Sequence, residues 1–285
     1  MRRPVYSIVI PCRNGSKTLA TQLEALLAQG SSVDIEIIVA DNGSVDGTAA
    51  LVRRFSERDG RVRLVDASGR PGINHARNTG IRASRGSAVL LCDADDVVRA
   101  GWIEAHRRAL EAGADCVGGA LERTFPDGTP AGRQEAVSTV HGFHPWPPGA
   151  NCGFQRRVFD RLGGFDETLL GGGDETDFFW RAAAAGHPTT AVPEAVVEYR
   201  LRGDLRAVAR QYFGYGRGTV RLFRRHRGLG MPRSFGWELP IVLVVGALQV
   251  ISPSRDGTRR RRGVERLSSR AGRAFESLQS RTWYL

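Results

Sequence analysis

Short apolar runs alternate with helical spacings along the first 120 residues. The apolar runs predict strands at residues 5–10, 35–39, 62–65, 88–91 and 115–121. Between them, apolar side chains recur every three or four positions, which predicts helices at residues 16–29, 46–57, 73–83 and 102–112. Strands that alternate with helices in this way favour an α/β fold with a mainly parallel sheet and right-handed crossovers.

This rhythm is lost after residue 121. Turns and prolines dominate the segment up to residue 150. The later patterns predict helices at residues 154–162, 176–185 and 205–225, and a strand within residues 190–199. An apolar stretch of 13 residues, Leu239 to Ile251, and a charge run, Arg259 to Arg262, follow.

Composition places the chain among ordinary globular proteins. It has 285 residues, of which 41% are hydrophobic and 25% charged, so a mainly disordered chain is not expected. No apolar run reaches the ~18 to 20 residues that span a bilayer. A secretory signal is not expected either, because Met1 to Pro4 lead directly into a strand-like segment. The four cysteines lack CxxC spacing, which argues against a zinc site and fits a reducing cytoplasm.

Positive charge is concentrated in the last third of the chain. Residues 200–285 hold 19 arginines against 5 acidic residues, which leaves +14, whereas the net charge of the whole chain is +11. The apolar stretch at residues 239–251 is open to three interpretations: a helix packed on the catalytic domain, an oligomer contact, or a helix in the interface of an anionic membrane. In the last case Arg233, Arg255 and Arg259 to Arg262 would meet the headgroups. Nucleic acid is not an expected partner, because the tail has no recognised nucleic-acid module.

Polar residues follow three of the predicted strands. They are Pro11-Cys12-Arg13-Asn14-Gly15, Asp41-Asn42-Gly43-Ser44-Val45-Asp46-Gly47-Thr48 and Asp93-Ala94-Asp95-Asp96. Ligands bind at the carboxyl ends of the strands in open parallel sheets, so we expect the three segments to form one site. Capping of the next helix by Ser44 or Asp46 is the alternative for the second segment. None of the three is a GxGxxG fingerprint or a P-loop.

The third segment has three carboxylates within four residues. Such carboxylates repel one another unless a cation compensates their charge. Hard divalent ions take oxygen ligands, and Mg²⁺ or Mn²⁺ commonly bridges carboxylate to phosphate. The pattern therefore predicts a divalent metal site, with a solvated turn in which Asp96 caps the next helix as the alternative.

Together with later motifs, these segments resemble the family 2 glycosyltransferases over about residues 5–220. The matching motifs occur in order: Ser7 to Pro11 with Asn14, Val39 to Thr48, Gly72 to Ile81, Asp93 to Asp96, Gly149 to Phe154, Gly163 to Glu167 and Gly173 to Asp177. The resemblance implies a GT-A type, Rossmann-like α/β fold, with a basic helical C-terminal extension in this chain. It also implies an inverting, metal-dependent transfer of sugar from a nucleotide-diphosphate sugar, with Mn²⁺ or Mg²⁺ as cofactor.

The resemblance also implies roles for particular residues. Asp41 matches the acid that contacts the donor base, and Arg77 matches the arginine of the ARN motif. Asp93 matches the first acid of the DXD motif, near the ribose and the metal, and Asp95 matches the acid that holds the metal. The remaining residues expected on the nucleotide-sugar side are Pro11, Arg13, Asn14, Asn42, Ser44 and Ala94.

Two neighbouring acids compete for the role of catalytic base. The family usually has Glu-Asp-x-Asp at this point, and this chain has Asp174-Glu175-Thr176-Asp177, with the first two acids interchanged. Alignment on Asp177 places Glu175 at the base position, and Asp174 is the alternative. Acids in a first helical turn also favour the positive end of the helix dipole, which is a structural interpretation of both.

Three further features concern the diphosphate, the acceptor and the number of sugars transferred. Arg210 and Arg217, in a tract of glycine and arginine, could clamp the diphosphate or lie on a membrane surface. Trp146 and Asn151 are the expected acceptor-side residues. The QxxRW motif of processive synthases is absent from the sequence. We therefore expect transfer of a single sugar.

The expected organisation is a catalytic domain at residues 1–227 and a basic extension at 228–285. The nucleotide-binding half would cover about residues 1–120 and the acceptor half about 121–227. We expect a UDP-sugar donor, an acceptor that is lipid-linked or membrane-proximal, and a cytoplasmic protein at the inner face of the membrane. The alternatives are a sugar nucleotidyltransferase and a non-enzymatic adaptor that binds membrane or nucleic acid through its tail. The sugar, the acceptor and the oligomeric state stay open.

Overall fold

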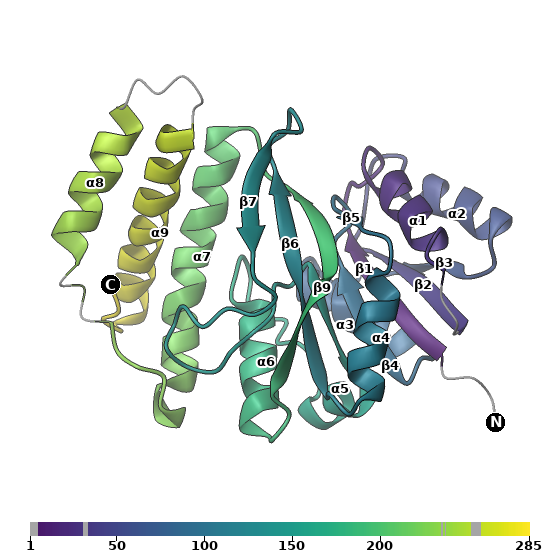
Figure 1. Ribbon diagram of the computed structural model, residues 1–285. Helices are drawn as coiled ribbons and strands as arrows, with labels where there is room; N and C mark the ends of the chain where they lie inside the picture. Colours follow the sequence, from purple (N-terminus) through teal and green to yellow (C-terminus); the bar gives the residue numbers. More distant parts are fainter. Residues whose placement is uncertain (1–4, 31–33, 235, 237, 252–257) are drawn as a thin grey trace. The chain divides into compact units, whose positions relative to one another are not determined.

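The chain folds into two compact units (Figure 1). The computed structural model describes residues 5–30, 34–234, 236, 238–251 and 258–285. The first unit contains residues up to 139, 144–167 and 175–201, and the second contains residues 140–143, 168–174 and 202–285. The division near residue 201 differs from the boundary expected at residue 227, because the helix at 205–226 packs with the helices that follow it.

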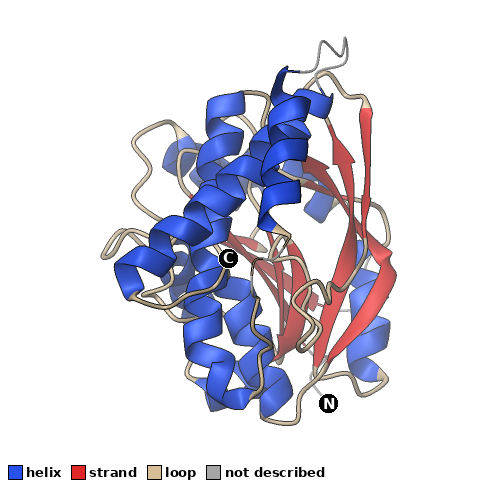
Figure 2. Cartoon of the chain, turned by 90° about the vertical axis from the view of Figure 1, so that its left-hand side faces the viewer, coloured by secondary structure: helices blue, strands red, loops and turns tan. Residues whose placement is uncertain are grey.

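A single twisted sheet forms the centre of the first unit (red in Figure 2). Its strands are β1 (Val5–Cys12), β2 (Asp34–Asp41), β3 (Val62–Asp66), β4 (Ala88–Cys92), β5 (Val97–Val98), β6 (Cys116–Thr124), β7 (Pro130–Gln134), β8 (Asn151–Gln155) and β9 (Thr189–Arg200). They lie in the order β3-β2-β1-β4-β8-β6-β9-β5, and β7 pairs with β6. The first four strands of that order are parallel, as are β6 and β9, whereas β8 is antiparallel to both neighbours. The expected α/β fold with a mainly parallel sheet is confirmed.

Helices cover both faces of this sheet. They are α1 (Leu19–Leu27), α2 (Thr48–Arg58), α3 (Ile73–Ala83), α4 (Trp102–Glu111), α5 (Arg156–Leu162) and α6 (Asp174–Ala184). Alternate residues of β1 point to opposite faces, so Ile8 and Ile10 join the core that α1, α2 and α4 cover. Val9 points toward α3, where a Cβ at Gly80 would lie 2.5 Å from Val9 Cγ1. Glycine at this position allows α3 to pack closely on the sheet.

The sequence missed three strands and one long helix. Residues 154–162 were expected to form a helix, but residues 151–155 form β8 and the helix begins only at Arg156. Strand β8 needs a glycine, because a Cβ at Gly153 would lie 2.5 Å from Leu90 Cδ2 on β4. This small residue removes the apolar pattern typical of a buried strand. The short β5 and the exposed β7 likewise lack that pattern.

The second unit is built mainly of three helices, α7 (Leu205–His226), α8 (Leu239–Ile251) and α9 (Thr258–Ser280), with a 3-10 turn at Arg227–Leu229. Helices α7 and α9 run parallel, since Gly272 of α9 lies against Phe213 of α7 and Glu276 bonds to Arg217, four residues further along each helix. They approach closely, and a Cβ at Gly272 would lie 2.1 Å from the carbonyl oxygen of Phe213. Among the described residues, no helix combines the length and apolar character needed to cross a membrane.

A buried polar network joins four elements of the first unit around Asn151. Its Nδ2 donates to the carbonyl oxygens of Ala120 on β6 (2.8 Å) and Ala195 on β9 (2.9 Å). Its Oδ1 accepts from Trp102 Nε1 (2.7 Å) and lies 2.9 Å from His106 Nε2. An amide oxygen can only accept, so neutral His106 carries its proton on Nε2. These bonds link β8 to β6, β9 and α4, so Asn151 has a structural role. Because Asn151 is fully buried, it has no surface for the acceptor contact expected of it.

His106 gives stability a specific dependence on pH. Burial lowers the pKa of His106 to about 4, from 6.5. Between these values the unfolded chain binds a proton that the folded chain does not, so this contribution to stability is lost as the pH falls through 6.5 toward 4. We expect about 2 kcal/mol to be lost between pH 7 and 5, since one pKa unit corresponds to ~1.4 kcal/mol. Urea unfolding at both pH values would measure it, and an equal loss in His106→Gln would contradict the assignment.

Candidate functional site

The loops that follow β1, β2 and β4 lie at one edge of the sheet. The three strands are parallel neighbours, and Cys12 at the end of β1 is in register with Asp41 at the end of β2. Directly after β2, the backbone nitrogen of Asn42 donates to the carbonyl oxygen of Cys12 (2.8 Å). The topology therefore brings the three predicted segments together.

Hydrogen bonds lock the first two loops to each other. The backbone nitrogen of Asn14 donates to Ser44 Oγ (2.8 Å), and the backbone nitrogen of Val45 donates to Asn14 Oδ1 (2.9 Å). Asn14 has a φ of 57°, a left-handed conformation that asparagine tolerates. The Ser44 nitrogen donates to Asp41 Oδ1 (3.0 Å), which fixes the orientation of the half-buried Asp41 carboxylate. Asn14 and Ser44 thus shape the loops on which Asp41 lies.

Asp46 adds a second link between the same loops. Its carboxylate accepts from the Ser16 and Thr48 amide nitrogens, both at 3.0 Å, and from the Thr48 hydroxyl. These bonds, with the Thr48 hydroxyl as the largest cause, hold the pKa of Asp46 well below its usual range. Gly47 is the N-cap of α2, and Asp46, one of the two capping candidates, bonds to Thr48 at the start of the helix. Arg13 is exposed beside these loops, and Pro11 is buried in β1.

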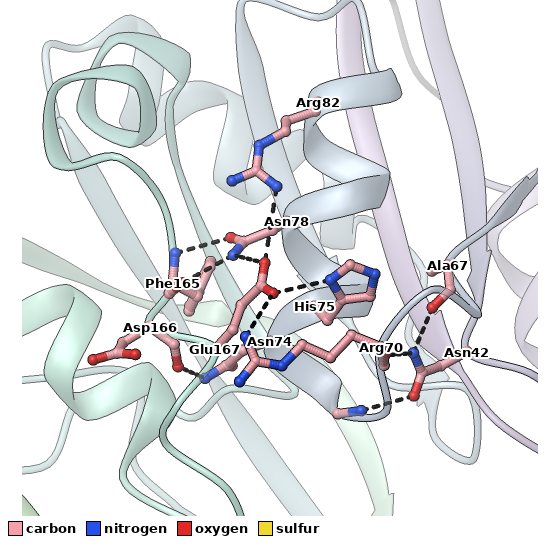
Figure 3. Close-up of polar contacts among 11 residues, drawn as sticks. Asn42, Ala67, Arg70, Asn74, His75, Asn78, Arg82, Phe165, Asp166 and Glu167 are labelled. Atoms are coloured by element: carbon pink, nitrogen blue, oxygen red, sulfur yellow. Dashed lines mark hydrogen bonds and ion pairs between the residues drawn. The ribbon is translucent and has the colours of Figure 1, made fainter.

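Asn42 holds the loop that leads into α3 (Figure 3). Its Nδ2 donates to the carbonyl oxygens of Ala67 (2.6 Å) and Arg70 (2.8 Å), and its Oδ1 accepts from the Gly72 nitrogen (2.9 Å). Only 7% of Asn42 is exposed. Its amide is occupied by the protein backbone, so the expected contact of Asn42 with the nucleotide has no support in this geometry.

Three carboxylates meet at the end of β4. One oxygen from each of Asp93, Asp95 and Asp96 lies within 4.8 Å of the other two. Asp96 is buried, and its Oδ1 accepts from the Arg200 nitrogen (3.1 Å), whereas its Oδ2 has no hydrogen-bond partner among the described residues. Burial, and then the charges of Asp93 and Asp95, raise the pKa of Asp96 to about 9. A hard divalent cation fits this oxygen cluster because it would offset the repulsion.

Buried Gln22 braces the acid loop from α1. Its Nε2 donates to the carbonyl oxygen of Asp93 (3.1 Å), and its Oε1 accepts from the Val98 nitrogen (2.9 Å). Gln22 therefore bonds to the backbone of the first acid and to the backbone two residues after the last acid. Fixing the backbone here keeps carboxylates together that would otherwise separate.

A set of bonds that we call the α3 clasp ties α3 to the turn at residues 163–167 (Figure 3). Asn78 Nδ2 donates to the Phe165 carbonyl oxygen (2.8 Å) and Glu167 Oε1 (2.9 Å), and Asn78 Oδ1 accepts from the Phe165 nitrogen (2.9 Å). Asn74 donates to the Asp166 carbonyl oxygen (2.7 Å), and His75 Nδ1 lies 3.0 Å from Glu167 Oε2. These contacts come from Asn74 and His75, which precede Arg77 in the chain, and from Asn78, which follows it.

Arg181 fastens α6 to the same turn. Its guanidinium donates to the carbonyl oxygens of Leu162 (3.2 Å) and Gly164 (2.8 Å) and pairs with Asp177 Oδ2 at 2.8 Å. Asp177 is fully buried. The last acid of the Asp174–Asp177 motif therefore positions the helix that carries Glu175.

Arg77 and Glu175 both lie beside Gly149. A Cβ at Gly149 would lie 2.9 Å from Arg77 Nη2 and 3.3 Å from Glu175 Cγ, so a side chain at this position would displace one of them. The Arg77 guanidinium carbon is 5.4 Å from the centre of the Phe165 ring, within cation–π range. Burial raises the pKa of the Cys152 thiol, on which the charges of Arg77, Glu175 and Asp93 also act. The charges of these three residues are thus all near enough to act on the Cys152 thiol.

Trp146 and Arg217 lie in surroundings that differ from those expected for an acceptor contact and a diphosphate clamp. Trp146 is 8% exposed and packs edge-on against Trp180, with ring centres 5.7 Å apart, so it offers little surface to an acceptor. Arg217 Nε donates to Glu276 Oε2 at 2.8 Å on α9, which holds its guanidinium in a structural ion pair instead of a diphosphate clamp. Arg210 is exposed on α7.

The family model "Glycosyl transferase family 2" matches residues 7–168, a span that includes the loops at the sheet edge and the α3 clasp. The chain belongs to this family. Among the curated members, it is 28% identical over 250 residues to the glycosyltransferase AglE of Haloferax volcanii, covering 84% of this chain and 81% of AglE. It is 27% identical over 245 residues to the succinoglycan biosynthesis protein ExoA of Rhizobium meliloti, covering 78% and 71%.

Solved structures of glycosyltransferases share the fold. The mannosyltransferase PcManGT of Pyrobaculum calidifontis, in complex with GDP-Man and Mn²⁺, superposes with a TM-score of 0.69 at 19% identity. The match covers 98% of this chain and 88% of that one. The fold is thus the GT-A type that the sequence resemblance implied, and the chain is a family 2 glycosyltransferase.

Several residues that organise this family 2 site were not identified from the sequence. Gln22, His75, Asn78 and Glu167 act on residues up to 92 positions away. For Gln22 and Asn78, a polar type at a buried helix position was the available signal, because a buried polar side chain needs partners. Capping of the next helix by Asp96 was the alternative to a metal site, and the structure shows Asp96 accepting from the backbone of β9 instead.

The α3 clasp is expected to depend on its buried bonds and not on its exposed ion pairs. Asn78→Ala leaves the Phe165 N–H and C=O groups without partners, and we expect it to cost about 3 kcal/mol of unfolding free energy. Arg82→Ala is the matched control, because exposed Arg82 reaches the same Glu167 carboxylate at 3.8 Å, and it should cost within ~0.5 kcal/mol. Denaturant unfolding measures both. Similar costs for the two variants would disprove the claim that the α3 clasp depends on its buried bonds and not on its exposed ion pairs.

Proposed function

We propose that this family 2 glycosyltransferase moves one sugar from a nucleotide-diphosphate sugar to an acceptor hydroxyl, with inversion and with the help of a divalent metal. The carrying observation is that the cluster of Asp93, Asp95 and Asp96 shares its surroundings with Arg77 and Glu175. This arrangement combines a metal site with a cation for a diphosphate and a carboxylate that can accept a proton.

On the donor side, the chain would hold the nucleotide across the sheet edge. Asp41, oriented by the Ser44 nitrogen, would accept from the base, and Asp93 would lie near the ribose. Asp95 is exposed and Asp96 buried, so Asp95 would present its carboxylate to the metal, with Asp93 as a further ligand. When bound, Mn²⁺ or Mg²⁺ would stabilise the negative charge that develops on the leaving diphosphate. Arg77 would add positive charge on the same side.

On the acceptor side, Glu175 would remove the proton from the attacking hydroxyl. Its side chain runs along Gly149 beside Arg77, and its charge acts on Cys152 together with that of Asp93. Because the nucleophile attacks opposite the leaving group, one carboxylate near the donor suffices and no covalent enzyme intermediate is needed. Asp174, which is 6% exposed, has less surface from which to reach a hydroxyl.

The donor and the extent of reaction belong to the same proposal. Solved structures with this fold contain GDP-Man with Mn²⁺ or UDP-GlcNAc, which supports a nucleotide-sugar donor. A UDP-sugar and a single transfer, without processive synthesis, stay our expectations. The nucleotidyltransferase alternative would release pyrophosphate, whereas the proposed reaction releases a nucleoside diphosphate, so the product identifies the reaction.

The metal site is tested by Asp95→Asn, which keeps the size of the side chain and removes its charge. We expect loss of turnover and at least ~10-fold weaker Mn²⁺-dependent binding of a nucleoside diphosphate, because a carboxylate ligand is replaced by an amide. Titration calorimetry with Mn²⁺ and with Mn²⁺-free buffer measures this. Glu57→Gln, on the exposed face of α2, is the control. Unchanged metal-dependent affinity in Asp95→Asn would refute the metal role.

The choice of base is tested by a pair of isosteric changes. Glu175→Gln should lower turnover at least ~100-fold, as expected for loss of a general base, while nucleotide affinity is kept. Asp174→Asn should be much milder. Release of nucleoside diphosphate from a panel of UDP- and GDP-sugars measures both. A dead Asp174→Asn beside an active Glu175→Gln would assign the base to Asp174 instead.

A further inference from the structure

Helix α8 exposes an apolar face. Most residues of α8 are apolar, yet five of its large residues are 44–75% exposed: Ile241, Leu243, Val244, Leu248 and Ile251. Most are three or four residues apart, so they form a stripe along one side of the helix. Exposed apolar stripes of this kind mark contact with a partner or a membrane.

The opposite side of α8 packs on α9. A Cβ at Gly246 would lie 2.8 Å from Leu267 Cδ2, and a Cβ at Gly263 would lie 2.7 Å from the Gly246 carbonyl oxygen. The two glycines let the helix backbones approach closely. Gly263 is also near Val250, so α8 and α9 run antiparallel and the end of α8 lies beside the start of α9.

Exposed arginines lie on the helix that packs against α8. Arg259, Arg260, Arg262 and Arg266 on the first half of α9 are all exposed. The Cβ of Arg266 lies 3.8 Å from where a Gly246 side chain would begin, which places it directly against α8. By contrast, Arg217 and Arg221 pair with Glu276, and Arg261 pairs with Glu265. Arg255, expected earlier at the headgroups, lies outside the described residues.

We propose that the α8 stripe and the neighbouring arginines of α9 form a docking surface for a bilayer that contains anionic lipids. Helix α8 has 13 residues and is about 20 Å long, too short to cross a ~30 Å hydrocarbon core. Lying in the interface, it would bury its apolar stripe among acyl chains while the arginines meet lipid phosphates. A second copy of this chain would bring an equally basic surface to the same place, so charge complementarity favours the lipid.

This inference does not depend on the proposed catalytic roles. It does bear on the acceptor, because an enzyme held at a bilayer meets lipid-linked or membrane-proximal hydroxyls at high local concentration. Docking and catalysis can therefore be measured separately on the same full-length protein.

The test is co-sedimentation of the full-length protein with phosphatidylcholine vesicles, with and without phosphatidylglycerol. We expect binding only to the anionic vesicles, and loss of that binding at about 1 M salt, where the Debye length is ~3 Å. The double variant Val244→Asp/Leu248→Asp should lower the partition coefficient at least ~10-fold. Arg260→Gln/Arg262→Gln should lower it about 25-fold, from about fivefold for each basic residue.

Matched controls change the same residue types elsewhere in the unit. Leu278→Asp alters an exposed apolar residue near the far end of α9, and Arg224→Gln/Arg227→Gln removes two exposed charges near the end of α7. Both should keep binding within about threefold of the unchanged protein, and all variants should release nucleoside diphosphate at the original rate. Equal binding to both vesicle types, or to neither, would overturn the proposal. Conversion of an oligomer to a monomer by Val244→Asp/Leu248→Asp, with vesicle binding intact, would assign the stripe to a second copy and overturn it too.

Discussion

Mutual repulsion among three carboxylates at the end of β4 is the constraint that shapes the site. Asp93, Asp95 and Asp96 are kept within 4.8 Å of one another, although burial and then the charges of Asp93 and Asp95 raise the pKa of Asp96. The fold holds them there through the backbone, with Gln22 on α1 and the Arg200 nitrogen on β9 as the bracing partners. A bound cation would offset this repulsion, and a cation held by acids is well suited to receive a diphosphate. In the proposed reaction, the neighbouring loops add Asp41 for the base of the nucleotide, Arg77 adds positive charge for the diphosphate and Glu175 acts as the general base.

The motif residues divide into those that face the site and those that hold the loops. Asn14, Ser44 and Asp46 link the first two loops, and Asn42 holds the entry to α3. In the next motif, Asn78 binds the turn at residues 163–167, while its neighbour Arg77 reaches Gly149. A motif of this kind therefore reports on loop geometry as much as on substrate contact. Substitution of a loop-holding residue would lower both stability and activity, whereas substitution of a site-facing residue would lower activity alone.

Sequence patterns predicted the parts of the fold that depend on local periodicity. Helices α3 and α8 begin and end at the predicted residues, because each has a clear apolar spacing or run. Strand β8 was missed since Asn151 and Gly153 serve contacts with other elements. Helix α9 was seen only as a charge run, because its mean hydropathy is low and its packing depends on glycines. The candidate site followed the same rule: the acid cluster was predicted from four adjacent residues, whereas the ion pair of Arg217 with Glu276 joins positions 59 residues apart.

The two compact units suit two kinds of work. The first contains the sheet edge and the charged residues of the site, and the second carries an apolar stripe beside exposed arginines. The central claim concerns the first unit: the acid cluster is a metal site that binds donor phosphates. Anomalous X-ray scattering at the manganese edge, from crystals grown with Mn²⁺ and a nucleoside diphosphate, tests it most directly. The account predicts an anomalous peak at direct coordination distance from the Asp95 carboxylate and the diphosphate. A nucleotide bound at the sheet edge with no manganese peak beside Asp95 would contradict it.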